Sequence, residues 1–236
     1  MLIPLTPGAL DQLIPRIATA SQYRYVWGKS RELLQRLLIS LLIIVSIWVV
    51  SLVFGHGAQG IELICYIVGG LYWFWAPIYV ASLRNAQYRR YAYGGFWRGQ
   101  VLDVYITEEL INEEQRANEY GELVIIENCE RRVNVEVGDE EGFNLTIQAP
   151  VKRLYKAIAP GQTAELLLLS QQADLDRIAK VSDLYLPQLN LWVGEYPYLR
   201  RDLFQDMSRR FANGSPQISS APSRSERKGG GQRRYS

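Results

Sequence analysis

The sequence predicts an α+β fold: a hairpin of two transmembrane helices, then a small, mostly-β domain (a barrel or a sandwich), then a disordered basic tail. Three observations lead to this prediction. Two long segments contain no charged residue, residues 99–211 contain short runs of alternating apolar and polar residues, and residues 212–236 are rich in Gly, Ser, Pro and Arg. Alternation is typical of half-buried strands, and a segment with so few apolar residues cannot form a core.

Charge is distributed unevenly along the 236 residues, although the formal net charge is only +2. Its sign changes by segment: basic in 1–36, nearly uncharged in 37–83, basic in 84–98, acidic in 99–200 and basic in 201–236. The composition excludes a coiled coil, a collagen-like chain, a wholly disordered protein and a disulfide-stapled secreted domain. It favours a membrane segment between basic flanks, followed by an acidic domain.

Residues 37–54 and 63–83 are the two uncharged segments. At about 1.5 Å per residue, each is long enough to cross roughly 30 Å of hydrocarbon. The alternative is a pair of buried helices in a soluble core, but the rest of the chain is too short and too polar to enclose them. Residues 55–62 leave room only for a tight turn, so we expect the two helices to be antiparallel neighbours.

Basic residues flank the two segments on the sides away from the turn: Lys29, Arg31, Arg36, Arg84, Arg89 and Arg90. Because the turn has no Lys or Arg, the positive-inside rule predicts a multi-pass protein with both termini in the cytoplasm. Tyr and Trp accompany these arginines, as they do at membrane interfaces. Lipid headgroups are therefore the expected contacts of Arg84, Arg89, Arg90 and Trp97 in the juxtamembrane collar, 84–98. Nucleic-acid binding, the other use of arginines beside aromatics, is disfavoured next to two membrane spans.

The segment 1–36 is expected to lie on the membrane surface. Leu10, Leu13, Ile14 and Ile17 have helical spacing, which predicts a short amphipathic helix along the cytoplasmic face. Pro15 weakens this prediction, because proline removes a helix hydrogen bond.

Aromatic residues also fall near the middle of the second apolar segment, where an interfacial role does not explain them. Trp73 and Trp75 are therefore candidates for binding a partner. Three alternatives stay open: packing within the hairpin, packing against another protein's helices, or contact with a pigment or quinone. No other cofactor is expected. Pro77 is expected to kink the helix just after these residues.

Short strands are predicted throughout the acidic domain, at 101–106, 123–126, 133–137, 143–147, 154–158, 164–169 and around 189–193. The clearest hairpin joins 133–137 to 143–147 through the turn GDEEG. A short helix is expected near 173–180, and the acidic pairs between 108 and 114 are expected to flank a loop. An amphipathic helix containing Leu203, Phe204, Met207 and Phe211 is expected to dock on the domain or on the membrane.

No catalytic residue and no metal site are expected. Cys65, Cys129 and His56 are scattered, whereas structural zinc usually takes four Cys or His ligands. His56 lies in a glycine-rich turn, far in sequence from any nucleophile that it would have to activate.

The segment 190–204 is different, because it combines aromatic residues with arginine, as the anchors of protein interfaces do. Partner binding is predicted for Trp192, Tyr196, Tyr198 and Arg200. The alternative is that this segment is a loop packed over the β domain.

Several motifs resemble one known family. They are LIPRIATASQYRYVWGK, LYWFWAPIYVASLRNAQYRRYAYGGFWRG, ELVIIENCERR, GF…APV, PGQ.AELLLLS and SDLYLP…NLWVGEYPYLRR. Over roughly residues 10–204 the chain is similar to the Acclimation of Photosynthesis to Environment family of cyanobacteria and chloroplasts. The resemblance implies a thylakoid membrane protein that acts in adjusting photosynthesis to light, and it carries over no catalytic residue.

Two functions from different classes follow. The first is a non-enzymatic membrane factor that binds a photosystem, with photosystem II favoured, during assembly, repair or reorganisation. The second is an oligomeric transporter or channel component, because cyanobacterial members of the family are also labelled phosphate transporter permeases. Two spans without an intramembrane basic residue or a discontinuous helix give no physical support to that label, although a homo-oligomer could still build a pore.

Overall fold

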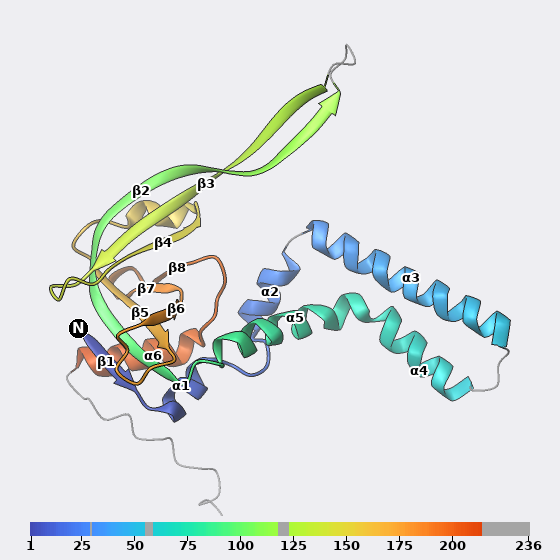
Figure 1. The fold of residues 1–236 in the computed structure, drawn as a ribbon, viewed down its shortest axis with the longest axis horizontal. Coiled ribbons are helices and arrows are strands. Elements are labelled where there is room, and N and C mark those ends of the chain that lie inside the picture. Colours follow the sequence, from blue (N-terminus) through green and yellow to red (C-terminus); the bar gives the residue numbers. More distant parts are fainter. Residues whose placement is uncertain (29, 55–58, 118–122, 214–236) are drawn as a thin grey trace, which may run out of the picture.

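The computed structural model describes residues 1–28, 30–54, 59–117 and 123–213, and it has an α+β fold (Figure 1). The helices are α1 (Pro7–Leu13), α2 (Ala20–Trp27), α3 (Ser30–Phe54), α4 (Gln59–Gly70), α5 (Tyr72–Tyr88) and α6 (Arg201–Ala212), with 3₁₀ helices η1 (Arg153–Ala157) and η2 (Pro187–Leu189). The strands are β1 (Leu2–Leu5), β2 (Tyr93–Ala117), β3 (Leu123–Gly138), β4 (Asn144–Pro150), β5 (Thr163–Ser170), β6 (Ile178–Val181), β7 (Leu184–Leu186) and β8 (Leu191–Val193).

The strands form one antiparallel sheet in the order β4-β3-β2-β5-β7-β8. β1 pairs with the first part of β2, and β6 pairs with β5. The sheet curls so far that its outer strands, β4 and β8, come into contact. It is therefore a partly closed barrel, and β2 and β3 extend from it as a two-stranded ribbon (Figure 1).

Alternate residues of β2 and β5 pack into two separate cores, one on each face of the sheet. Trp97, Leu166 and Leu168 pack inside the curl with Val133, Val135 and Val137. On the other face Phe96, Leu167 and Leu169 pack against α1 and α6, through Leu10, Leu13, Phe204 and Met207. The period of two along β5 is thus invisible in its sequence, LLLL, because both faces are buried.

The N-terminal segment corrects one prediction. Leu2–Leu5 pairs with β2, and Leu10, Leu13 and Ile14 of the predicted amphipathic helix are buried in the domain. Residues 1–14 therefore belong to the β domain and have no apolar face left for a membrane surface. α6 docks on this domain as well, which decides between the two docking sites expected for it.

Three predictions within the domain are wrong in detail. Residues 154–158 lie mostly in η1 and are not a strand; Tyr155 and Ile158 are buried three residues apart, which is the 3₁₀ period. The segment near 173–180 contains no helix but ends in β6, after Leu175 adopts a positive φ of 60°. Instead of a loop at 108–114, the ribbon of β2 and β3 continues to Ala117 and Leu123. Both the turn at 55–58 and the predicted disordered tail from 214 lie outside the described residues.

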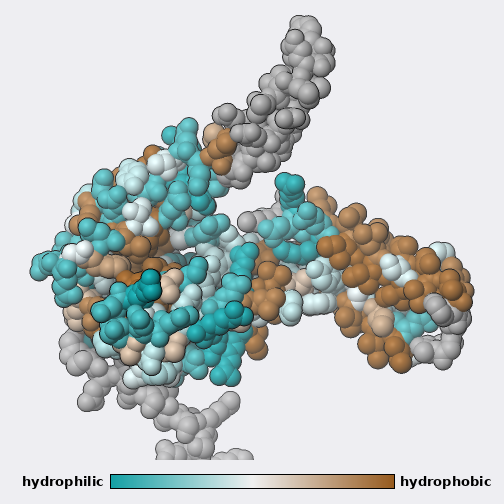
Figure 2. Space-filling model, in the orientation of Figure 1, coloured by the Kyte–Doolittle hydropathy of each residue, from teal (hydrophilic) through white to brown (hydrophobic). Residues whose placement is uncertain are grey.

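The helices α3, α4 and α5 project away from the sheet and carry the most apolar surface of the view in Figure 2. Among the described residues, Arg31–Val53 of α3 is long and apolar enough to cross a membrane. α4 and α5 meet the same criterion only together, as Gly60–Gly70 and Tyr72–Tyr88, which are bent by 67° relative to each other. The helical break is at Leu71, not at Pro77, through which α5 continues.

Candidate functional site

The candidate site is the place where α2 and α5 meet the segment after β8. We call it the junction and define it by the residues Gln22, Asn85, Tyr88, Asp183, Tyr196, Tyr198 and Arg201. It joins the apolar helices to the barrel. Its position makes it the part of the molecule that sets how the barrel is held relative to those helices (Figure 1).

Two buried amides form the centre of the junction. Gln22 and Asn85 donate to each other's side-chain oxygen, at 2.8 and 2.9 Å, and both side chains are fully buried. Gln22 also donates to the carbonyl of Pro197 at 2.9 Å. One residue thus links α2, α5 and the segment after β8. The N-terminus of α2 fixes its position, because Gln22 is the last residue of a capping box with Thr19.

Aromatic rings pack around this amide pair. Tyr196 meets Tyr25 edge to face at 5.2 Å between centroids, and the Arg84 guanidinium lies 5.2 Å from the Tyr196 ring centroid. Tyr88 stacks on Tyr198 at 3.8 Å. Burial raises the pKa of Tyr196 to about 12, since the phenolate loses its hydration there, although Arg84 acts in the opposite direction.

A buried carboxyl lies on the barrel side of the junction. Asp183 is shielded from solvent, and its nearest cation is the Arg201 guanidinium, 3.7 Å from Oδ2. Burial raises the pKa of Asp183 to about 7, with Arg201 offsetting part of this rise. Arg201 is itself held by the Trp192 ring, 5.1 Å from its centroid. Gly194 passes so close to Asp183 that a Cβ there would lie 2.7 Å from the Asp183 Cβ, so this crossing requires glycine.

The N-terminal segment completes the junction and corrects the prediction for Arg89. Its guanidinium donates to the carbonyl of Ile14 at 2.8 Å and to the Asp11 carboxylate at 2.7 Å. The Arg200 backbone N–H donates to the carbonyl of Leu13 at 2.9 Å. Arg89 therefore ties α5 to the N-terminal segment, and its hydrogen-bonding groups are directed into the chain instead of toward lipid headgroups.

Trp97 also lies elsewhere than predicted. Its side chain is in the core of the barrel, 1% exposed, and its indole Nε1 donates to Asp139 at 2.7 Å. A buried indole has no surface to offer to lipid, so this prediction is wrong. The reason is that the collar, 84–98, includes the start of β2. Arg84 and Arg90 are exposed, and for them lipid contact stays a prediction.

The segment 190–204 packs against the rest of the chain, as the alternative of a loop packed over the β domain predicted. Trp192 and Tyr196 are buried, Tyr198 is half-buried and stacked, and only Arg200 of the predicted set is exposed. The structure thus brings together Trp192, Tyr196 and Tyr198, but as contacts within the chain.

Trp73 and Trp75 lie apart from that cluster, at the start of α5. The Trp73 ring is 5.7 Å from that of Trp27, and the Trp73 backbone N–H donates to Ser40 Oγ at 3.2 Å. Trp75 Nε1 donates to the carbonyl of Val68 across the bend, at 2.9 Å. Both indoles therefore contact the chain itself, and the exposed aromatic side chains of this region are Phe74 and Tyr79.

Several important polar residues were missed by sequence reasoning. Glu165 is fully buried in β5 and bound by Arg98 at 2.5 Å, and Asp183, Gln22 and Asn85 were not singled out. Only Gln22 had a usable signal, the capping-box pattern Thr19-x-x-Gln22. Within the described part of the chain, no group of three or more His, Cys, Asp or Glu is arranged to hold a metal ion.

Comparison with known proteins gives one match. Residues 3–217 match DUF8619, a family of unknown function. No curated protein and no solved structure matches the chain.

Proposed function

The chain belongs to the DUF8619 family, whose function is unknown, and we propose that it is a non-enzymatic membrane protein that holds its barrel at the cytoplasmic face of a bilayer and binds a membrane complex there. The observation that carries the proposal is the junction. It fixes strongly apolar, exposed helices to a polar domain through buried contacts.

The first part of the proposal is the membrane hairpin, formed by α3 and the bent pair of α4 and α5. Only 17% of the apolar window of α3 is buried within the chain, which is unlike a core helix of a soluble protein. Val53 alone is 73% exposed. Leaving such a surface in water costs about 25 cal/mol per Å², so a bilayer or a partner is expected to cover it.

Contacts between the helices support an antiparallel arrangement. Gly69 lies against Ile43, and Trp73 lies against Ser40. In this register Trp73 lies level with Ser40, which is three residues after Leu37, where the first apolar segment begins. If α3 spans the bilayer, Trp73 and Trp27 are near the cytoplasmic interface and not at the midplane. The interface is the level that tryptophan prefers. The junction lies beyond them, on the same side as the N-terminus.

The second part of the proposal is the partner. We propose a thylakoid location and a photosystem as the bound complex, with photosystem II favoured, during assembly, repair or reorganisation. The sequence resemblance given above supports this choice of partner. The exposed rings of Phe74 and Tyr79 on α5 offer contact area to neighbouring helices, in addition to the predicted Trp73 and Trp75.

Affinity purification in mild detergent tests the partner. We expect photosystem subunits to co-purify with the tagged protein, and we expect less recovery with Phe74→Ala/Tyr79→Ala. Val53→Ala, at the far end of α3, is the matched control for an exposed apolar residue. Recovery without photosystem subunits under every light regime would contradict the proposal.

One observation favours the second candidate, an oligomeric transporter or channel component. The break at Leu71 makes α4 and α5 a discontinuous helix, which the sequence analysis did not expect, and helices of this kind line the sites of many transporters. Flux measured in proteoliposomes tests this candidate. A strictly monomeric protein without flux would exclude it, and an absorption spectrum without a bound chromophore would likewise exclude pigment binding.

A further inference from the structure

One edge of β2 has no partner strand over much of its length. From Tyr93 to Gln100, β2 pairs with β5 on this edge. The last hydrogen bonds on this edge join Val101 to the residues just before β5. The Val101 N–H donates to the Gln162 carbonyl at 2.9 Å, and the Gly161 N–H donates to the Val101 carbonyl at 2.8 Å. Beyond Val101, among the described residues, β2 pairs only with β3, on its opposite edge. An unpaired edge presents main-chain N–H and C=O groups to any extended chain. Within this stretch the Val104 N–H already donates to the Asp103 carboxylate, so an added strand would use other groups of the edge.

A groove runs beside this open edge, between β2 and the segment that contains η1. Its volume is 530 Å³, and its floor is formed by Val104, Ile106, Val133 and Ile158. Ile106 is 55% exposed, and Leu154, on η1 itself, is 69% exposed. An extended segment added to the edge would direct every second side chain toward this apolar floor.

The far wall of the groove is basic. Lys152 and Lys156 line it, and the exposed Arg153 lies between them in sequence. Among the described residues, no carboxylate lies within ion-pairing distance of these three side chains, and the sequence contains no acid from 142 to 164. The acid on the opposite wall, Asp103, accepts a hydrogen bond from the Val104 N–H at 2.8 Å.

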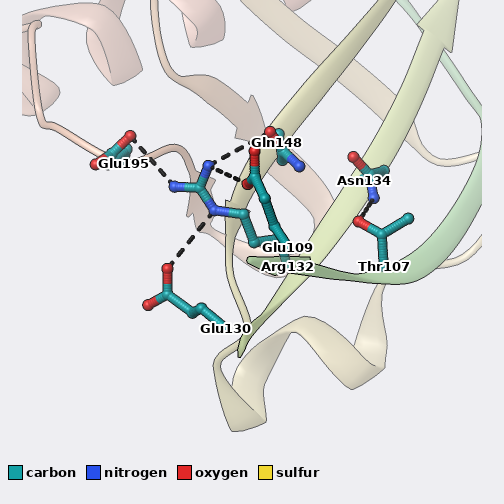
Figure 3. A network of polar contacts seen from close by, with 7 residues as sticks. All are labelled: Thr107, Glu109, Glu130, Arg132, Asn134, Gln148 and Glu195. Carbon is teal, nitrogen blue, oxygen red and sulfur yellow. Dashed lines mark hydrogen bonds and ion pairs between the residues drawn. The ribbon is translucent and has the colours of Figure 1, made fainter. Parts of the chain in front are cut away.

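The open edge is held rigidly from the other face of the ribbon. Arg132 contacts Glu109 at 2.8 Å, Glu130 at 3.7 Å and Glu195 at 3.5 Å, and so links both strands of the ribbon to the segment after β8 (Figure 3). Asn134 donates to Thr107 Oγ1 at 2.8 Å beside it. Such a preformed edge loses little conformational freedom on binding.

We propose that the open edge of β2, from Leu102 to Thr107, binds an extended acidic segment of a partner protein as an additional strand. Main-chain hydrogen bonds provide affinity, alternate apolar side chains enter the groove, and the acidic side chains meet Lys152 and Lys156. This site does not depend on what the helices contact in the membrane.

Charge distinguishes this occupant from two others. The chain's own residues 201–236 are basic, so Lys152 and Lys156 would repel them. In a second copy of the chain paired through the same edge, the two acidic strands, each with Asp103, Glu108 and Glu109, would lie side by side, and like charges placed across a ladder are destabilising.

Fluorescence anisotropy with the full chain in nanodiscs tests the proposal. The probes are labelled peptides of alternating sequence, EVEVEVE and KVKVKVK. We expect EVEVEVE to bind and KVKVKVK not to bind. Lys152→Glu/Lys156→Glu should weaken EVEVEVE binding roughly tenfold or more, whereas Lys180→Glu, a charge reversal on the exposed face of β6, should not change it.

Peptide chemistry tests the added strand without altering the protein. EVEVEVE with N-methyl groups along one edge should lose binding, while the peptide methylated along its opposite edge should keep it. Equal binding of the two methylated peptides, or unchanged affinity after the lysine reversal, would overturn the proposal. A dimer that Ile106→Asp converts to monomer would overturn it too, because the edge would then belong to a second copy.

Discussion

The helices α3–α5 and the barrel show opposite relations between chemistry and burial. On the helices, apolar residues such as Leu38, Leu41 and Val53 are exposed. In the barrel and the junction, polar side chains such as Glu165, Asp183 and Gln22 are buried. The contrast supports our proposal that a bilayer or a partner covers the helices, and it shows that the buried polar groups hold specific elements together rather than fill a core.

This difference also determines where substitutions act. A buried charge or amide that loses its partner retains its full desolvation cost, so the barrel and the junction are sensitive to single changes. An exposed apolar side chain on α3 has few partners within the chain, so we expect its loss to change the binding of the protein to a membrane and not the stability of the barrel.

The largest effect is expected for Glu165→Ala. Removing this carboxylate leaves Arg98 without its ionic partner, although it still donates to the Ser208 carbonyl, and we expect a loss of about 3–5 kcal/mol of unfolding free energy. Denaturant unfolding of the protein in detergent measures it. Asp206→Ala removes the exposed pair with Arg209 and should cost below about 1 kcal/mol. Equal effects of the two variants would contradict the importance of buried polar contacts.

The next effect is a pH dependence caused by Asp183. Because its pKa is raised to about 7 in the folded state, the folded protein keeps a proton there that the unfolded chain releases near pH 4. This contribution to stability is complete below pH 4 and is lost as pH rises to 7, by roughly 1.4 kcal/mol per pH unit. Asp183→Asn should remove this slope and be more stable than wild type at pH 8. Parallel pH profiles for the two proteins would contradict this prediction.

A smaller effect is expected at the amide pair. Gln22→Leu leaves the Asn85 amide buried without its partner, and we expect a loss of about 1–3 kcal/mol. The double variant Gln22→Leu/Asn85→Leu should recover part of this loss. A double-mutant cycle of unfolding free energies measures the coupling between the two side chains. Arg24→Ala, on the exposed face of α2, is the control. Purely additive single effects would show that the two amides are not coupled.

The smallest effect on stability is expected on α3. Leu41→Ala truncates an exposed residue and should change the unfolding free energy of the barrel by less than about 0.5 kcal/mol. Leu41→Arg should leave the barrel equally stable but reduce retention of the protein in membranes washed with alkaline carbonate. If Leu41→Arg destabilised the barrel and left membrane retention unchanged, α3 would act through contacts within the chain, which would contradict the comparison.

The sequence predicted best what depends on neighbouring residues. α3 and the hairpin of β3 and β4 follow from local composition and alternation, and the burial of Phe204 and Met207 follows from helical spacing. Residues whose environment is set by distant segments were mispredicted or missed. Trp97 resembles an interfacial residue until β3 and β5 enclose it, and Arg89 resembles a headgroup ligand until the N-terminal segment supplies Asp11 and Ile14.

The ribbon and the junction were unpredictable for the same reason. Dense acidic residues at 108–114 are typical of a loop, but pairing with β3 keeps β2 extended to Ala117. The partners of Gln22 are Asn85 and Pro197, far away in the chain, and no spacing rule connects them.

The central claim is that α3, α4 and the start of α5 lie in a bilayer while the barrel stays in water, and the native cysteines test it directly. Cys65 lies on α4 and Cys129 on β3, and both are exposed in the structure. Cys65→Ser and Cys129→Ser leave one thiol each, to be labelled with a membrane-impermeant maleimide in sealed vesicles whose cytoplasmic face is outward. We predict that Cys129 reacts at once and that Cys65 reacts only after detergent dissolves the bilayer. Equal labelling of both thiols before detergent would contradict the account.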